Sequence, residues 1–273
     1  MDEVKNLKLL CNRVRKDIIS MIAEASSGHP GGSLSAVELM VGIYHVMRVD
    51  PKNPDDPMRD RFVLSKGHAA PCYYAILGEK GFFDVKEFGN FRQIHSMLQG
   101  HPDARKVPGV DASTGSLGQG ISIAVGMALG AKKAGQDIKV YTMLGDGEIQ
   151  EGLVWEACMA AAKYHLDNLT IVIDNNGLQI DGQNDEVMPL GDLHRKMESF
   201  GLNVIELPDG NDIEQVVGSL YLKTITGKPK CIIAHTTKGK GVSFMENQVG
   251  WHGKAPNAEE TKLALEELSK EVV

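Results

Sequence analysis

The sequence has only four cysteines in 273 residues, and Cys11, Cys72, Cys158 and Cys231 are widely spaced. They form no C-x-x-C pair, so the spacing indicates neither a disulfide framework nor a cysteine zinc site. We therefore expect reduced thiols and a cytoplasmic location. Long apolar runs are also missing, because the longest, Ile121–Ala131, is interrupted by serine and glycines and is too short to span a bilayer. The N-terminus is charged and lacks the apolar core of a secretory signal.

Acidic residues outnumber basic ones, with 36 Asp and Glu against 29 Lys and Arg, which gives a net charge of −7. This balance argues against nucleic acid or an anionic membrane as a partner, so a phosphate-bearing ligand must be met by local groups. The nine histidines show no His-x-x-x-His or HExxH spacing, which makes a zinc site a weak explanation for them. Hydrophobic residues make up 42% of the chain, which is ordinary globular usage.

Short apolar runs alternate with helical patterns along most of the chain. The runs typical of buried strands are Phe62–Leu64, Lys139–Leu144, Leu169–Asp174, Val204–Leu207 and Cys231–His235. Helical patterns cover residues 7–25, Gly118–Ala134, Leu153–His165, Leu190–Phe200, Asp212–Thr224 and Ala258 to about Glu271, and Ser33 or Ser35 is expected to cap a further helix that runs through Met47. This alternation predicts an α/β fold, a single domain over residues 1–273 with a parallel sheet flanked by helices on both faces. A ligand should lie past the carboxyl ends of the strands.

The most informative segment is VYTMLGDGEIQEG at Val140–Gly152, followed about one βα unit later by IVIDNNGLQIDG at Ile171–Gly182. A strand, a glycine turn and a helix N-terminus are typical of diphosphate sites. Here Asp146 stands between Gly145 and Gly147, and it would repel a bare diphosphate unless a divalent cation lay between the two anions. Neither the G-x-G-x-x-G of a dinucleotide site nor the G-K-[ST] of a P-loop is present.

The double asparagine at Asn175 and Asn176 completes the predicted cation site. Carboxylate and amide oxygens at neighbouring strand ends suit Mg²⁺, which also takes phosphate oxygens and water as ligands. We expect Mg²⁺, with Ca²⁺ or Mn²⁺ as alternatives, to bind Asp146, Asn176 and a backbone carbonyl such as that of Leu178. Alternatively, Asp146 only caps the following helix and Asn176 only makes a turn, but the two residues together favour the metal site.

Four of the nine histidines stand beside glycine in expected loops: His29 in SGHPGG, His68 in SKGHA, His101 in QGHPD and His252 in GWHGK. A loop histidine can project into a cleft, and its near-neutral pKa suits proton transfer or hydrogen bonding to hydroxyl and phosphate oxygens. For any one of them alone, a structural role is the alternative. We assign structural roles to the other five, which are His45, His95, His165, His194 and His235.

Longer motifs occur along the same chain. They are SSGHPGGSLSAVEL at Ser26–Leu39, RDRFVLSKGHAAPCYYAIL at Arg59–Leu77, GHPD at Gly100–Asp103, STGSLGQGISIAVGMAL at Ser113–Leu129 and WHGKAPN at Trp251–Asn257. Together with the GDG and double-asparagine segments, they resemble, in the same order, the N-terminal, thiamine diphosphate-binding domain of transketolases. The resemblance runs from near residue 10 to near residue 260. It implies thiamine diphosphate as cofactor and the transfer of a two-carbon ketol unit from a ketose phosphate to an aldose phosphate.

The resemblance also implies roles for single residues. Around the reactive carbon and the hydroxyls of the donor sugar it places His29, His101 and His252. At the diphosphate and its metal it places His68, Gly145, Asp146, Gly147, Asn176 and again His252. The remaining positions resemble aminopyrimidine contacts (Gly115 and Leu117), the aliphatic wedge that bends the cofactor (Ile180) and a subunit-interface glutamate that links paired active sites (Glu151).

In transketolases, the glutamate on the pyrimidine nitrogen and most sugar-phosphate ligands lie in the following domain, and this sequence stops shortly after WHGKAPN. The chain therefore resembles the N-terminal subunit of a split transketolase. The resemblance implies a second chain with the pyrimidine-binding and C-terminal domains, in an α2β2 assembly. A fragment of a longer chain is the alternative, but Met1 and the tail ELSKEVV look like natural ends.

One segment departs from this pattern, since TTKGKGVSFMENQVGWHG at Thr236–Gly253 is similar to deoxyxylulose-phosphate synthase as much as to transketolase. The alternative function is therefore another thiamine-dependent ketol or acyl transferase that acts on a different sugar. An alternative from a different class is a cofactor-binding regulatory module, against which the four loop histidines argue.

Overall fold

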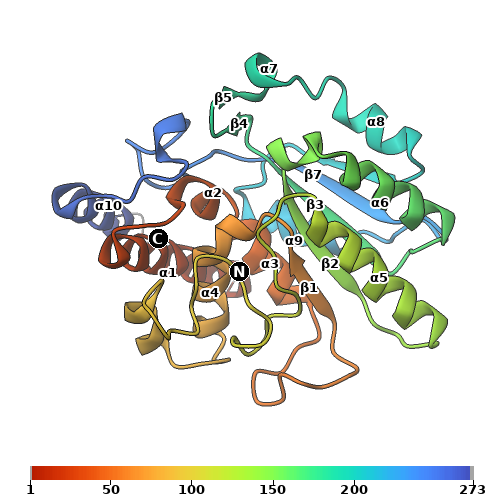
Figure 1. Cartoon of the computed structure of the whole chain (residues 1–273), viewed down its shortest axis with the longest axis horizontal. Helices are drawn as coiled ribbons and strands as arrows, with labels where there is room; N and C mark the ends of the chain where they lie inside the picture. Colours follow the sequence, from red (N-terminus) through yellow and green to blue (C-terminus); the bar gives the residue numbers. More distant parts are fainter. Residues whose placement is uncertain (1, 271–273) are drawn as a thin grey trace.

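A computed structural model describes residues 2–270, and its centre is a five-stranded parallel sheet (Figure 1). The strands are β1 (Arg61–Leu64), β2 (Val140–Gly145), β3 (Leu169–Asn175), β6 (Asn203–Leu207) and β7 (Lys230–His235). Their order across the sheet is β1-β2-β3-β7-β6, and every neighbouring pair is parallel. The predicted α/β fold is confirmed, and each of the five predicted strand segments corresponds to one of these strands.

Helices cover both faces of the sheet because successive strand residues point to opposite faces and are apolar on both. Met143 and Val172 belong to one core cluster, whereas Leu144 and Ile171 belong to the other. The first cluster includes side chains of α1 (Asp2–Ala25), α3 (Val37–Val46), α4 (Ala70–Glu79) and α9 (Ile213–Tyr221). The second includes side chains of α5 (Gln119–Lys133), α6 (Gly152–Lys163) and α8 (Leu193–Ser199).

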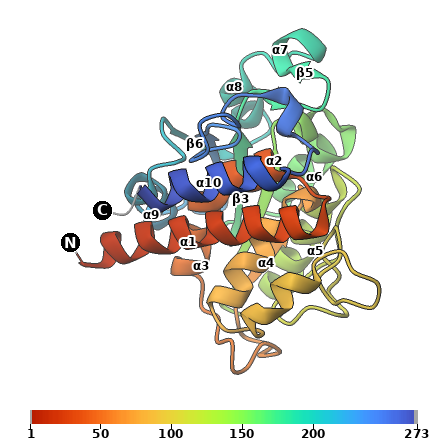
Figure 2. The ribbon, with the colours of Figure 1, turned by 90° about the vertical axis from the view of Figure 1, so that its left-hand side faces the viewer.

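The remaining elements are short or peripheral. They are α2 (Pro30–Ser35), α7 (Asn184–Val187), α10 (Ala258–Lys270), the two-stranded pair β4 (Leu178–Gln179) and β5 (Gly182–Gln183), and 3-10 turns at Gly67–Ala69, Val85–Asn90, Gly147–Gln150 and Val249–Trp251. Helix α10 packs along α1 (Figure 2), where the Asn12 amide donates to the Leu268 carbonyl at 2.8 Å. The expected last helix is present as far as Lys270, and Glu271 lies outside the described residues.

The expected serine cap of the second helix is wrong. Helix α2 begins at Pro30, and a short break at Ala36 separates it from α3, so Ser33 and Ser35 lie inside the first of these helices. The Ser33 hydroxyl donates back to the His29 carbonyl at 2.7 Å, and the Ser35 hydroxyl donates to the Asp174 carboxylate at 2.6 Å. A long-range carboxylate therefore engages Ser35, which sequence periodicity does not reveal.

The register of the sheet brings the two diagnostic segments together. Gly145 at the end of β2 pairs with Asp174 near the end of β3, and Asp174 pairs with Ala234 near the end of β7. The turns that follow these strands therefore meet at one edge of the sheet, as expected for parallel strands. Within residues 2–270 there is no helix with the length and apolar character that a membrane crossing requires.

Candidate active site

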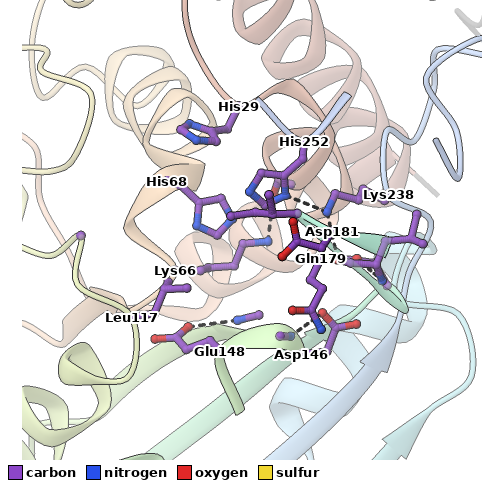
Figure 3. Close-up of a pocket in the computed structure, with 17 residues that line it drawn as sticks. His29, Lys66, His68, Leu117, Asp146, Glu148, Gln179, Asp181, Lys238 and His252 are labelled. Carbon is purple, nitrogen blue, oxygen red and sulfur yellow. Dashed lines mark hydrogen bonds between the residues drawn. The ribbon is translucent and has the colours of Figure 1, made fainter. Parts of the chain in front are cut away.

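A cavity of about 260 Å³ lies at the carboxyl edge of the sheet (Figure 3). Its walls come from the turns after β1, β2 and β3 and from four further segments, at residues 29–32, 115–117, 238 and 252. The residues that line it are His29, Gly32, Lys66, His68, Gly115, Leu117, Gly145, Asp146, Gly147, Glu148, Asn176, Leu178, Gln179, Ile180, Asp181, Lys238 and His252. The structure thus brings together all of the predicted site residues except His101 and Glu151, which lie outside this lining.

Asp146 faces the cavity from the turn after β2 with only 2% of its surface exposed. Its carboxylate accepts hydrogen bonds from the Gly147 amide at 2.8 Å and from the Gly177 amide. Burial, and next the negative charge of Asp174, raise the pKa of Asp146. A divalent cation would compensate both effects, so the position suits a metal ligand. Asp146 also caps its own turn, as expected from the alternative interpretation in which it only caps the following helix.

The other two expected metal ligands, Asn176 and Leu178, flank Gly177, whose amide donates to the Asp146 carboxylate. The Asn176 side-chain oxygen accepts from the Leu178 amide at 3.2 Å, and the Leu178 carbonyl accepts from the Lys238 ammonium at 2.9 Å. Among residues 2–270, no group of three His, Cys, Asp or Glu side chains could hold a metal. The set at this edge contains one carboxylate, one amide and one backbone carbonyl. These are hard oxygen donors that leave room for phosphate oxygens and water, which fits Mg²⁺.

The four loop histidines form one cluster. The ring of His29 lies 5.4 Å from that of His68, 5.5 Å from that of His252 and 6.5 Å from that of His101, measured between centroids. His68 and His252 are 5.3 Å apart. The four residues come from separate loops, at residues 29, 68, 101 and 252, and only the tertiary fold joins them.

The surroundings of these histidines favour the neutral imidazole by lowering the pKa of each. Burial, followed by the positive charge of Arg92, lowers the pKa of His29 to about 4. Burial and the neighbouring Lys238 ammonium lower the pKa of His252 to about 3. The same two causes, burial first and nearby cations second, also lower the pKa of His68 and His101. A neutral imidazole can both donate and accept, so the cluster is suited to hold hydroxyl groups and to pass protons.

Two buried lysines in the cavity were missed by the sequence analysis. Lys66 is 1% exposed, forms an ion pair with Asp174 and donates to the Gly32 carbonyl at 2.9 Å. Lys238 is 2% exposed and lies 2.9 Å from His252 Nδ1. Both belong to motifs noted in the sequence, SKGHA and TTKGKG. Because lysine is common at protein surfaces, the motifs alone did not indicate that these two side chains are buried in a cavity. Together they supply local positive charge in an acidic protein.

Three other predicted positions are exposed. Ile180 lies on the turn between β4 and β5 and is 65% exposed, and Leu117 precedes α5 and is 36% exposed. Glu151 is exposed at the position before α6. Large apolar side chains at the mouth of a cavity are suited to contact a ligand or another protein surface.

Most of the histidines that were assigned structural roles have partners that do not line the cavity. His194 and His235 each contact Glu206 at 2.9 Å, and His45 lies 3.3 Å from Glu3. His165 follows α6, and its Nδ1 lies 3.3 Å from the Gly227 carbonyl. None of these histidines, nor His95, lines the cavity.

Comparison with known families decides the class of this site. Residues 7–271 match the family described as transketolase, thiamine diphosphate binding domain. The chain belongs to this family. It is 44% identical over 260 residues to one subunit of the apulose-4-phosphate transketolase of Actinobacillus succinogenes, with 94% of each chain covered. A 6-deoxy-6-sulfo-D-fructose transketolase subunit of a Clostridium species is 41% identical over 268 residues, with 97% of each chain covered.

A solved structure agrees with these sequence matches. A transketolase variant from Pichia stipitis superimposes with a TM-score of 0.91 at 33% identity. The match covers 96% of this chain but only 40% of that one. The chain is therefore a transketolase-family, thiamine diphosphate-binding domain that spans less than half the length of that transketolase.

Proposed function

We propose that this chain is the diphosphate-binding subunit of a two-chain transketolase-type enzyme. It would act with thiamine diphosphate and Mg²⁺ to transfer a two-carbon ketol unit from a ketose phosphate to an aldose phosphate. The observation that carries the proposal is the cavity itself. Its lining combines hard oxygen donors, the ammonium groups of two buried lysines and three of the four clustered histidines, His29, His68 and His252.

The diphosphate end of the cofactor would lie at the carboxyl edge of the sheet. Asp146, Asn176 and the Leu178 carbonyl would hold the metal between themselves and the diphosphate oxygens. His68, which is half-buried beside Lys66, would donate to those oxygens. Gly145 and Gly147 line the cavity on either side of Asp146, and without side chains they would let the ligand approach the backbone.

The donor sugar would lie at the other side of the histidine cluster. When bound, thiamine diphosphate supplies the carbon that becomes a nucleophile and stabilises the resulting carbanion. His29, His101 and His252 would hydrogen-bond the hydroxyl groups of the ketose and move their protons, for which neutral imidazoles are required. The aminopyrimidine would rest on Gly115 and Leu117, with Ile180 beneath the bend of the cofactor.

A second chain would complete the site. Ile180 and Leu117 are large apolar side chains left exposed at the mouth of the cavity, which fits burial against the cofactor and a partner surface. Relatives of nearly equal length carry the word subunit in their names. We propose a partner with the pyrimidine-binding domain, an α2β2 assembly in which Glu151 contributes to a subunit interface, and a cytoplasmic enzyme.

The proposal also concerns which sugar the enzyme uses. The relatives named above are described by apulose-4-phosphate and by 6-deoxy-6-sulfo-D-fructose, so similar chains are associated with different sugars. We propose the common transfer between ketose and aldose phosphates, with another sugar substrate as the alternative.

The test is reconstitution with the chain encoded by the adjacent reading frame. Alone, this chain should show no turnover of xylulose 5-phosphate with ribose 5-phosphate at saturating thiamine diphosphate and Mg²⁺, and it should hold the cofactor weakly. The two chains together should be active. Assays of the assembled enzyme with a panel of other ketose donors then identify the sugar. Robust turnover by the isolated chain would contradict the two-chain proposal.

A further inference from the structure

The buried carboxylate of Glu148 connects three segments that surround the cavity. Glu148 follows the GDG turn, lines the cavity and is only 2% exposed. One of its oxygens accepts from the Ser65 hydroxyl and from the Gly118 amide at 2.8 Å, and the other accepts from the Gly145 amide at 3.1 Å. Ser65 follows β1, Gly145 ends β2, and Gly118 ends the loop before α5.

The loop that ends at Gly118 depends on such support. Gly115 and Gly118 have φ angles of +153° and +81°, and the N-cap residue of α5 is Gly118, which has no side chain that could accept from the first turn. The Thr114 hydroxyl fixes the start of this stretch by donating to the Leu64 carbonyl at 2.7 Å. Glu148 fixes its end, and a carboxylate is favourable at the positive end of a helix such as α5. Residues 115–118 are therefore held between these two anchors.

We propose that Glu148 is a positioning residue that sets residues 115–118 for the aminopyrimidine half of the cofactor. This inference rests on the proposed function, which places the aminopyrimidine against Gly115 and Leu117. The diphosphate half would be held by Asp146, Asn176 and the Leu178 carbonyl. Glu148 also accepts from Gly145 on the diphosphate side, but Gly145 is held independently by the sheet, where it pairs with Asp174 of β3. Removal of the negative charge from Glu148 should therefore affect recognition of the organic half of the cofactor more than recognition of its diphosphate.

The change Glu148→Gln isolates this role because it keeps the shape of the side chain. A carboxylate offers only acceptors to its three donors, whereas a glutamine must turn its NH₂ group toward at least one of them. Leaving a buried hydrogen-bond donor without a partner shifts the equilibrium for local opening by roughly a factor of ten or more. Glu156→Gln is the matched control, since Glu156 is exposed on α6.

Hydrogen exchange of the chain without any ligand is the first measurement. In Glu148→Gln, peptides covering residues 113–120 should exchange about tenfold faster, while peptides from α9 and α10 and the Glu156→Gln control stay unchanged. Unchanged exchange at residues 113–120 would overturn the proposal. A uniform increase over the whole chain would also overturn it, because it would show a general stabilising role.

Calorimetric titration at millimolar ligand separates the two halves of the cofactor. Glu148→Gln should weaken binding of Mg²⁺–thiamine diphosphate about tenfold and leave binding of Mg²⁺–pyrophosphate within a factor of two. Equal losses for both compounds would contradict the positioning role and leave the proposed function intact. Where the isolated chain binds too weakly, the same titrations are made on the assembled two-chain enzyme. A wild-type assembled enzyme that binds neither compound would contradict the proposed function, and the positioning role with it.

A second variant serves if Glu148→Gln does not fold. Ser65→Ala removes one donor to the same carboxylate oxygen and leaves the charge and the two amide hydrogen bonds in place. Its effect should have the same pattern with a smaller size, namely faster exchange at residues 113–120 and a selective loss for thiamine diphosphate. Ser65→Ala with wild-type exchange and equal affinities would overturn the proposal.

Discussion

The ammonium of Lys66 is paired with the carboxylate of Asp174 inside the protein, where the two side chains are 1% and 0% exposed. Asp174 also accepts from the hydroxyls of Ser35 and Thr236. Burial alone would raise the pKa of Asp174, but Lys66 and these hydrogen bonds hold it below its ordinary value. One carboxylate therefore joins α2 and the turns after β1 and β7 to the end of β3.

Asp174→Asn should destabilise the fold strongly. The variant leaves the Lys66 ammonium buried without an opposite charge, and breaking such a pair from one side costs about 3–5 kcal/mol. Urea denaturation at pH 7 measures the loss in the free energy of unfolding. Asp55→Asn, at an exposed position, is the control and should change it by less than about 0.5 kcal/mol. A loss below about 1 kcal/mol for Asp174→Asn would contradict the importance of the pair.

Asp146→Ala should abolish Mg²⁺-dependent binding of thiamine diphosphate in the assembled enzyme. The side chain faces the cavity and supplies the only carboxylate of the expected metal ligands. Asn176→Ala should weaken binding less, because an amide has no charge to lose. Calorimetric titration of both variants with and without Mg²⁺ measures the effect, and circular dichroism checks the fold. Wild-type affinity in Asp146→Ala would refute the assignment of the metal site.

Alanine substitutions of the four clustered histidines should have different effects on cofactor affinity and on kcat/KM. His29→Ala and His101→Ala should keep cofactor affinity but lose kcat/KM for the ketose by about 10²–10⁴-fold, as expected for loss of a proton-transfer group. His68→Ala should instead raise the Kd of the cofactor, and His252→Ala should do both. Cofactor titrations and donor half-reaction rates on the assembled enzyme give the two quantities. The same profile for His29→Ala and His68→Ala would show that the division of roles is wrong.

The depressed pKa of His29 makes the fold sensitive to acid. The folded protein holds this imidazole neutral down to about pH 4, whereas the unfolded chain protonates it below its ordinary pKa of 6.5. Stability is therefore lost as the pH falls through the window from about 6.5 to about 4. His29→Asn should lose less unfolding free energy between pH 7 and pH 5 than the wild type, by about 1 kcal/mol or less, because part of the ring is exposed to water.

Urea unfolding at the two pH values measures this difference, with His95→Asn as the control. His95 lies in a loop at a φ of +68°, a conformation that asparagine also adopts, and it lies outside the lining of the cavity. A pH dependence of His29→Asn equal to that of the wild type would show that burial of His29 contributes nothing to acid sensitivity.

The strands and the residues at their ends could be read from the sequence because their signals are local. A run such as Leu169–Asp174 is apolar throughout most of its length, which is typical of a parallel strand buried on both faces. Asp146 and Asn176 follow two such strands directly, so the parallel arrangement alone brings them to one edge. The glycines beside His29, His68 and His252 likewise marked those side chains as loop residues that could reach a cavity.

Only the tertiary structure revealed the contacts of Lys66, Lys238 and Glu148. Each is a common surface residue type in a segment without periodicity, and its partners lie on other strands or loops, as in the contact of Lys238 with the Leu178 carbonyl. The same reason explains the wrong cap at Ser35, whose hydroxyl binds Asp174 instead of a helix end. Sequence patterns determined what each segment forms, because propensity and hydrophobic period act over a few residues. The fold decided which charges meet, because burial and pairing depend on groups far apart in the chain.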